Sequence, residues 1–456
     1  MEHSGHHFVA IFGGSIAGSE AAFQLAQRGF RVVVFDQNTL PYGKIEDGLP
    51  LWHIKLRDKV EQRIDDKLMH PNIRFIPGIK LGVDIDFTDV ARNWGFSAVL
   101  LAIGAWRDRP IPVKDIDNFV GKGLIYQNPL MYWFNHKHEH NYDGPKFELN
   151  DNAIIVGGGL ASLDVAKVVM IETVQRALLK RGIKENVFTL EKGISKVLNN
   201  HNLTLEELKL KGCTLFYRRR SIDMPLTIIQ RDTPEKIEKA QTVTAKILNN
   251  FKSKYLFKFR SNYAPVDKLI GSHGELEGLV FQKTKIKHGE LVMVNDAVEE
   301  VKASAVISSI GSLPEKIPGI PFNTTAYKLS DMSNCQVEGF KNVFAIGNAV
   351  TGRGNIKESL LHGKITSLKI MDSYLSQQEN GFHNYVRKTE NNIARQTKVI
   401  GDKISSIKPQ KDDVIQTILD RTRKLQNNVI FNGRYLDWIS KKKPVRLENI
   451  LDKEEK

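Results

Sequence analysis

The sequence predicts a three-layer α/β protein with two Rossmann-like dinucleotide-binding domains and a mostly helical C-terminal extension. Three observations predict this fold class. Apolar strand patterns alternate with helical patterns, as in parallel, doubly wound sheets. Two of the strands run directly into glycine-rich loops that open helices, which indicates an internal duplication of a βαβ unit. The length of 456 residues also exceeds what one domain of about 100–200 residues would need.

Seven strands are expected from apolar runs bounded by turn residues. They are Phe8–Phe12, Arg31–Phe35, Ala98–Ile103, Ala153–Val156, Thr214–Tyr217, Ala305–Ile310 and Val343–Ile346. The first and fourth strands begin the two βαβ units, which are expected to fill residues 1–110 and 111–325. Residues 376–456 are polar, and short helices such as Asp412–Gln426 are expected there. This extension is predicted to pack as an accessory layer or to be partly mobile.

The composition narrows the class of protein. A net charge of +14 favours an acidic partner. Two cysteines without a C-x-x-C motif argue against a dithiol centre, an iron–sulfur cluster or a thiolate zinc site. No apolar run approaches the roughly 18 residues of a membrane span, so no membrane insertion is expected. The first strand leaves no room for a signal peptide, and a cytoplasmic location is therefore expected.

The first glycine-rich loop, 13–18, has the sequence GGSIAG and departs from G-x-G-x-x-G at its middle position. Gly13 allows the tight turn, and Gly18 allows the helix to pack close to the strand. Ser15 replaces the middle glycine, and its hydroxyl could donate to a phosphate oxygen. Asp36 ends the next strand, where the fingerprint places an acid for a ribose hydroxyl pair. The loop is therefore predicted to hold a dinucleotide on the helix N-terminus.

The second loop, 157–162, has glycines at its first and middle positions and Ser162 at the third. The strand that follows it ends in Tyr217 and three arginines, Arg218–Arg220, in place of an acid. Guanidinium groups bind phosphate in a bidentate manner, so this unit is expected to prefer the 2′-phosphate of NADP(H). The second strand of the first unit is thus followed by an acid, and that of the second unit by arginines. This difference indicates two different dinucleotides, FAD in the first unit and NADPH in the second.

These stretches resemble the adrenodoxin-reductase-type ferredoxin–NADP reductases, flavoproteins related to the glutathione reductase superfamily. The resemblance runs from about Phe8 to about Ser367. The segment PYGKIEDGLPLWH, at 41–53, and the loop GGGLASLDVA, at 157–166, are similar to two family motifs. The positions kept in them are Pro41, Gly43, Gly48, His53, Gly157, Gly159, Leu163 and Asp164. Arg218 and Arg219 match the arginine pair of the family. The resemblance also implies that residues 326–375 return to the first unit, so that residues 1–110 and 326–375 form one discontinuous FAD-binding domain.

The chain departs from the family pattern at three places. Leu160 stands where the family has Asn, which removes a polar contact near the NADP diphosphate. Leu51-Trp52 replaces the Pro-Asp that precedes the family histidine. Asn348 replaces a late Trp, and it could hydrogen-bond the ribitol of the flavin. The resemblance is therefore to a divergent member.

The resemblance implies hydride transfer from NADPH to FAD and electron delivery to an acidic carrier, a ferredoxin or flavodoxin. His53 is the implied catalytic residue, which would tune the flavin potential or relay a proton. Backbone amides around Gly354–Ile356 would face the reduced flavin. The expected cofactor-binding residues are Gly13, Gly14, Ser15, Ala17, Gly18, Asp36, Gly43, Gly104, Gly157, Gly159, Leu160, Ser162, Arg218, Arg219, Gly347, Asn348, Gly354 and Ile356.

Two other function classes remain open from the sequence. One is a flavin-dependent oxidoreductase or monooxygenase that acts on a small molecule, and the other is a non-enzymatic NADPH sensor or scaffold. The alternating histidines His136, His138 and His140 are expected to be exposed, with no dedicated metal. The basic segment 440–446 is interpreted as a solvated loop, and no nucleic-acid partner is expected. The acceptor and the oligomeric state stay open.

Overall fold

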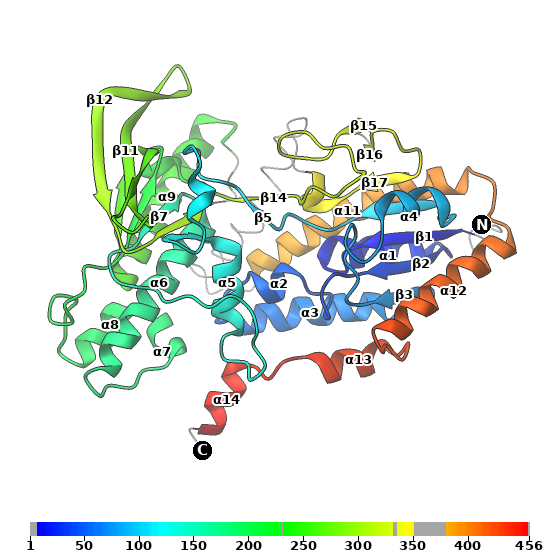
Figure 1. Cartoon of the computed structure of the whole chain (residues 1–456), viewed down its shortest axis with the longest axis horizontal. Coiled ribbons are helices and arrows are strands. Elements are labelled where there is room, and N and C mark those ends of the chain that lie inside the picture. The colour runs from blue at the N-terminus through cyan, green and yellow to red at the C-terminus, as the bar shows by residue number, and fades with distance from the viewer. Residues whose placement is uncertain (1–6, 228, 230, 332–334, 351–379, 455–456) are drawn as a thin grey trace.

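The computed structural model describes residues 7–227, 229, 231–331, 335–350 and 380–454. Two lobes lie side by side, each built around its own parallel sheet (Figure 1). Most of the C-terminal helical segment lies along the lobe that contains the N-terminus, whereas its last helix lies below the junction of the two lobes (Figure 1). In the described part of the chain, no helix combines the length and the apolar character needed to cross a bilayer.

The first lobe contains a seven-stranded sheet in the order β15-β16-β17-β4-β1-β2-β3. Its parallel strands are β1 (Phe8–Phe12), β2 (Arg31–Phe35), β3 (Ile73–Ile76), β4 (Ala98–Leu101) and β17 (Val343–Ala345), and two short antiparallel strands, β15 (Leu329–Asp331) and β16 (Gln336–Val337), extend it. The chain leaves this sheet after β4 and returns to it at β15. The lobe is thus built from two separate parts of the sequence.

The second lobe contains a five-stranded parallel sheet in the order β6-β13-β7-β8-β9. Its strands are β6 (Leu124–Tyr126), β7 (Ile154–Gly157), β8 (Thr214–Tyr217), β9 (Lys258–Ser261) and β13 (Val306–Ser309). Two short strands, β5 (Arg107–Asp108) and β14 (Ser312–Leu313), pair antiparallel where the chain passes between the lobes.

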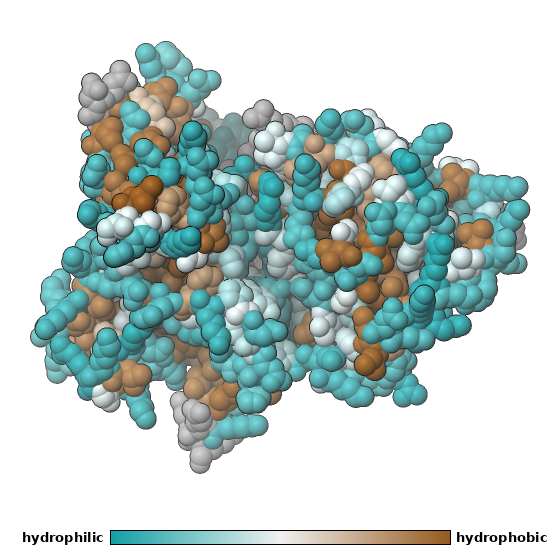
Figure 2. Space-filling view, in the orientation of Figure 1, coloured by the Kyte–Doolittle hydropathy of each residue, from teal (hydrophilic) through white to brown (hydrophobic). Residues whose placement is uncertain are grey.

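An antiparallel sheet of β10 (Tyr263–Ile270), β11 (Leu276–Lys287) and β12 (Glu290–Lys302) projects from the second lobe and was not expected from the sequence. Its strands carry many charged residues, so they lack the continuous apolar runs of the parallel strands. Apolar side chains gather on its visible face (Figure 2). The exposed apolar residues of these strands include Ile270, Ile286, Met293 and Val298.

Helices cover both faces of the two main sheets. In the first lobe they are α1 (Ile16–Gln27), α2 (Lys44–Asp47), α3 (Ile54–Leu68) and α4 (Phe87–Asn93). In the second they are α5 (Gln127–His136), α6 (Leu160–Leu179), α7 (Val187–Glu191), α8 (Ile194–Asn200) and α9 (Pro234–Tyr255). All five residues of β1 are buried, and alternate residues enter the cores on opposite faces of the sheet. A strand covered on both faces reads as a continuous apolar run, which is why β1 was visible in the sequence.

The C-terminal extension forms α11 (Asn380–Ser405), α12 (Asp412–Asn428), α13 (Tyr435–Lys442) and α14 (Leu447–Glu454). Val386, Ile393 and Ile400 recur at seven-residue intervals on α11, so one face of the helix joins the core beside α1. Ile415 and Ile418 of α12 join the core on the opposite face of the same sheet. The extension thus includes the long helix α11 as well as short helices. Helices α11 and α12 pack on the first lobe, whereas Leu447 of α14 packs against the core of the second lobe.

Candidate functional site

The first glycine-rich loop is a tight turn between β1 and α1. Gly13 has a φ of 99°, and its amide donates to the Phe35 carbonyl at 2.7 Å. A Cβ at Gly13 would lie 2.5 Å from the Ala102 carbonyl oxygen, and one at Gly18 would lie 1.7 Å from the Gly13 carbonyl oxygen. Both positions therefore require glycine, in the roles that a dinucleotide-binding turn gives its first and third glycines.

A pocket opens at the carboxyl ends of β1, β2 and β4, where α/β sheets bind their ligands. It encloses about 1170 Å³ of empty space, counting its open side. The predicted cofactor residues that line it are Gly13, Ser15, Ala17, Asp36, Gly43, Gly104 and Gly347. Gly14 and Gly18 of the same loop are buried and do not line the pocket. The structure thus brings seven of the predicted residues, from five separate segments of the chain, to one cavity.

Asp36 lies at the edge of this pocket and is buried. Its two carboxylate oxygens accept hydrogen bonds from the amides of Gly14, at 2.7 Å, and Asn38, at 2.8 Å. Burial raises the pKa of the carboxyl to about 7, although both hydrogen bonds act in the opposite direction. The first loop and the acid that ends β2 are therefore held together before any ligand binds.

The Ser15 hydroxyl is used inside the protein. Its Oγ donates to the Tyr42 carbonyl at 2.8 Å, across the turn that leads into α2. The expectation that this hydroxyl could donate to a phosphate is therefore wrong for this conformation, because its single proton is engaged. The Ser15 side chain instead joins the first loop to the segment 41–44 through this hydrogen bond.

The second loop leaves its middle position open. Cβ atoms at Gly157 and Gly158 would lie 2.5 Å from the Ser309 carbonyl oxygen and 2.1 Å from the Tyr217 ring. A Cβ at Gly159 would meet nothing within 4 Å. Leu160, the first residue of α6, is buried in the core of the second lobe, and the Ser162 hydroxyl donates to the Gly159 carbonyl. The open backbone at Gly159 suits the close approach of a diphosphate.

The three arginines after β8 have different surroundings. Arg220 forms a bidentate ion pair with Asp223, through distances of 2.8 and 2.9 Å. Arg218 is exposed and Arg219 is half-buried, and neither has an ion-pair partner among the described residues. Burial lowers the pKa of Arg109, and the nearby charges of Arg218 and Arg107 lower it further. The guanidinium group of Arg109 is therefore close enough to the other two to be repelled by them. Sequence reasoning missed Arg109, although it lies in the segment WRDR between the lobes.

His53 immediately precedes α3 and lies beside a buried charged cluster of the second lobe. The ammonium of Lys167 is fully buried, 2.6 Å from Glu191 and 3.9 Å from the centroid of the Trp52 ring. Burial lowers the pKa of His53 well below 6.5, and the charge of Lys167 adds to this effect. The imidazole is therefore neutral at neutral pH. It is not among the residues lining the first pocket.

Asp164 belongs to the same cluster and was noted in the sequence only as a family position. Among the described residues, its Oδ1 is buried without a hydrogen-bond partner, and burial raises its pKa to about 7. Two further predicted sites, Gly354 and Ile356, lie outside the described residues. Asn348 lies in the short helical turn Gly347–Val350, next to the pocket-lining Gly347.

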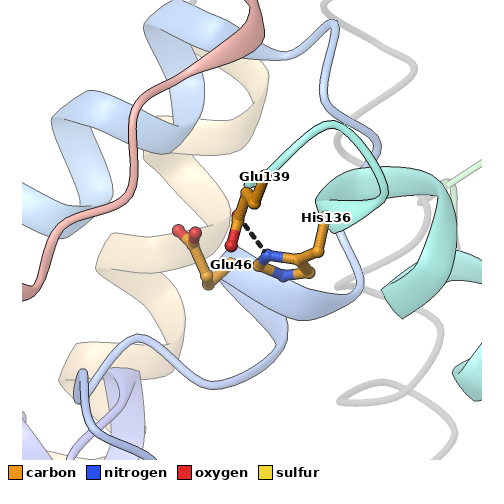
Figure 3. Close-up of side chains that lie close together, drawn as sticks. All are labelled: Glu46, His136 and Glu139. Atoms are coloured by element: carbon orange, nitrogen blue, oxygen red, sulfur yellow. Dashed lines mark hydrogen bonds and ion pairs between the residues drawn. The ribbon is translucent and has the colours of Figure 1, made fainter. Parts of the chain in front are cut away.

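The side chains of Glu46, His136 and Glu139 converge between α2 and the end of α5 (Figure 3). His136 is buried, so the expectation that it is exposed is wrong. It contacts Glu139 at 2.6 Å and Asp47 at 3.2 Å. Burial lowers its pKa, but hydrogen bonds to the two carboxylates raise it to about 9 overall. Glu46 is bound by Arg446, and we therefore interpret the group as a network of ion pairs.

The basic segment 440–446 is not a solvated loop throughout. Arg446 donates to Glu46 at 2.7 Å and to Glu61 at 2.8 Å. Lys443 contacts Glu61 at 2.9 Å. The expectation of a solvated loop is therefore wrong for this segment. Its cations are counter-ions of buried acids on α2 and α3, and the two acids bound by Arg446 lie 400 and 385 residues away from it in the sequence.

Comparisons with known proteins agree with this geometry. Residues 7–207 match the model of the pyridine nucleotide-disulphide oxidoreductase family. The glutamate synthase [NADPH] small chain of Mycobacterium tuberculosis is 30% identical over 164 residues, covering 34% of this chain and 32% of that protein. The mitochondrial NADPH:adrenodoxin oxidoreductase of Arabidopsis thaliana is 26% identical over 173 residues, covering 37% and 34%. The matched part thus spans about a third of these curated relatives.

The fold also matches a solved structure. Mycobacterium tuberculosis FprA in complex with NADPH superposes with a TM-score of 0.58 over 86% of this chain and 90% of that one, at 17% identity. Together the matches confirm the predicted resemblance and the fold with two Rossmann-like domains. The prediction of FAD and NADPH as cofactors agrees with them.

Proposed function

Because residues 7–207 carry a pyridine nucleotide-disulphide oxidoreductase domain, we propose that the chain is an NADPH-dependent flavoprotein reductase. In this proposal it passes electrons from NADPH through FAD to a ferredoxin- or flavodoxin-type carrier in the cytoplasm. The observation that carries the proposal is the contrast between the two loops. The first loop opens on a pocket that contains the buried acid Asp36. The strand after the second loop leads to Arg218 and Arg219, which have no carboxylate partner among the described residues.

The residues of the first pocket fit FAD. The helix N-terminus at Ile16 offers amide groups to a diphosphate, and Asp36 offers a carboxylate to a ribose. Bound FAD would supply the ability to accept a hydride and to release electrons one or two at a time. The chain's own task is to hold FAD at the first loop and to hold NADPH at Gly159, Arg218 and Arg219.

His53 and Asp164 are proposed to hold protons beside the nicotinamide end of the site. A neutral imidazole can accept or donate a proton, and a carboxyl with a pKa of about 7 exchanges one near neutral pH. Both groups are placed by the same buried cluster around Lys167. Their role in proton handling remains part of the proposal.

The carrier is proposed from charge. A chain with a net charge of +14 attracts an acidic protein and steers brief encounters with it. Electron transfer to an acidic carrier should then slow as salt is added, because exposed charges are screened within about 10 Å at 0.1 M ionic strength.

The test begins with the absorption spectrum of the purified protein, followed by anaerobic addition of NADPH and, separately, NADH. A flavin band that bleaches faster with NADPH supports both sites. Reduction of ferredoxin or flavodoxin is then followed at rising salt concentrations. A protein that takes up no FAD contradicts the whole proposal. Turnover with a small molecule or with oxygen, and none with any carrier, would favour the small-molecule class instead.

A further inference from the structure

A lysine that the sequence analysis did not select lines the first pocket. Lys44 is half-buried and follows Gly43, which has a φ of 54° at the start of α2. Its Nζ donates to Asn128 Oδ1 at 3.0 Å and to Ser312 Oγ at 3.1 Å. An ammonium has three N–H donors, so these two neutral oxygens leave one donor for a further acceptor.

Lys44 has no close counter-ion in the described part of the chain. None of the ion pairs found there within 4.0 Å includes it, and Asp108 and Asp47 act on it only from a greater distance. The other lysine of the pocket, Lys80, contrasts with it because Lys80 pairs with Glu315 at 3.0 Å. Burial lowers the pKa of Lys44 to about 8, so the side chain is still mainly charged at neutral pH. Among the described residues, no carboxylate forms an ion pair with this charge.

The turn that carries Lys44 is attached to the dinucleotide-binding loop. The Ser15 hydroxyl donates to the Tyr42 carbonyl, and a Cβ at Gly43 would lie 3.2 Å from the Ser15 Cβ. Ser15, which departs from the G-x-G-x-x-G pattern, thus holds the turn of Lys44 against the first glycine-rich loop. Loops of this kind receive a diphosphate, which carries the formal negative charge of oxidised FAD.

We propose that Lys44 is a phosphate-binding residue of the FAD site and that Ser15 positions its turn. Lys44 supplies a positive charge to the diphosphate of the cofactor, in addition to the amides of the helix N-terminus. The inference rests on the proposed function, since it requires FAD in the first pocket. It adds a cation at a position that the dinucleotide fingerprint does not specify.

The test uses the full-length chain freed of flavin and measures the binding of FAD and of ADP by calorimetry. ADP carries the diphosphate and the adenosine without the flavin ring. Lys44→Met should weaken both ligands by the same factor, about tenfold or more, because a hydrogen bond to a charged group contributes roughly 1.5–3 kcal/mol. Lys44→Arg should restore most of the affinity. Lys55→Met removes a charge from an exposed position on α3 and should change neither affinity.

Far-UV circular dichroism checks that each variant is folded, and Lys44→Gln serves as a second variant if Lys44→Met is not. Unchanged FAD affinity in a folded Lys44 variant would overturn the inference and leave the proposed function standing. Weakened FAD binding with unchanged ADP binding would also overturn it, because the contact would then be to the flavin. Wild-type protein that binds neither ligand would overturn the inference and the proposed function together.

Discussion

The ammonium of Lys167 lies 3.9 Å from the centroid of the Trp52 indole ring, and this contact joins the two lobes. Trp52 belongs to the segment that follows α2, whereas Lys167 lies on the first helix of the second βαβ unit. The ring centroid of Tyr255 lies 4.8 Å from the same ammonium. Two aromatic rings are thus close enough to attract the cation through their quadrupoles.

Lys167→Met should destabilise the protein strongly. The substitution leaves the carboxylate of Glu191 in partly buried surroundings without the ammonium that lies 2.6 Å from it. Removing one partner of a buried pair typically costs about 3–5 kcal/mol, and we expect a loss of this order in the free energy of unfolding. Urea unfolding would measure it, with Lys239→Met on the exposed face of α9 as the control. A loss below that of the control would show that the cluster does not stabilise the fold.

Arg218→Ala and Arg219→Ala should reduce the preference for NADPH over NADH. Both arginines lack an ion-pair partner among the described residues, so their charge is available to a 2′-phosphate. We expect KM for NADPH to rise by about tenfold or more, with KM for NADH nearly unchanged. Arg220→Ala is the matched control, because that guanidinium is held by Asp223. Equal effects of the three substitutions would contradict the assignment.

Ser15→Gly restores the dinucleotide fingerprint, yet we expect it to weaken FAD binding. The substitution removes the hydrogen bond from Ser15 to the Tyr42 carbonyl and frees the turn of Gly43 and Lys44. A neutral hydrogen bond contributes about 0.5–1.5 kcal/mol, which corresponds to a few-fold rise in the dissociation constant. Ser15→Ala should behave in the same way. Tighter binding by Ser15→Gly would mean that the serine is only a tolerated substitution.

The strands and loops of the two βαβ units were predictable because their signals are local. The strand β1, the turn at Gly13 and the helix from Ile16 follow one another within a few residues, and each needs a specific residue type. Asp36 was predictable as well, since the acid lies at a fixed place at the end of β2. These features require no knowledge of the rest of the chain.

The contacts that complete the sites were not predictable because they join distant parts of the chain. Lys44 meets Ser312, and Glu46 meets Arg446, across separations of 268 and 400 residues. A lone lysine or arginine in a polar stretch most often lies in solvent, so its residue type carries no signal of such a contact. The burial of His136 was missed for the same reason, because the carboxylate of Asp47 comes from the other lobe.

His136→Gln should destabilise the protein at pH 6 and have little effect near pH 10. Contacts with Asp47 and Glu139 raise the pKa of His136 in the folded protein to about 9, whereas the unfolded value is about 6.5. A raised pKa means that the folded state binds the proton more tightly. The stabilisation is therefore complete below about pH 6.5 and is lost as the pH rises through 9. Urea unfolding of both proteins across this range would measure the difference.

His140→Gln is the control for this prediction, since His140 is exposed and four residues away on the same connection. Its effect on the free energy of unfolding should be small at every pH. Glu139→Gln should give part of the His136 effect, because one of the two carboxylates that hold the imidazolium is then neutral. If the difference between wild type and His136→Gln were the same at pH 6 and pH 10, the pKa of the imidazole would be the same in the folded and unfolded states, which would contradict the prediction. The ion-pair network between α2 and α5 would then depend on Arg446 alone.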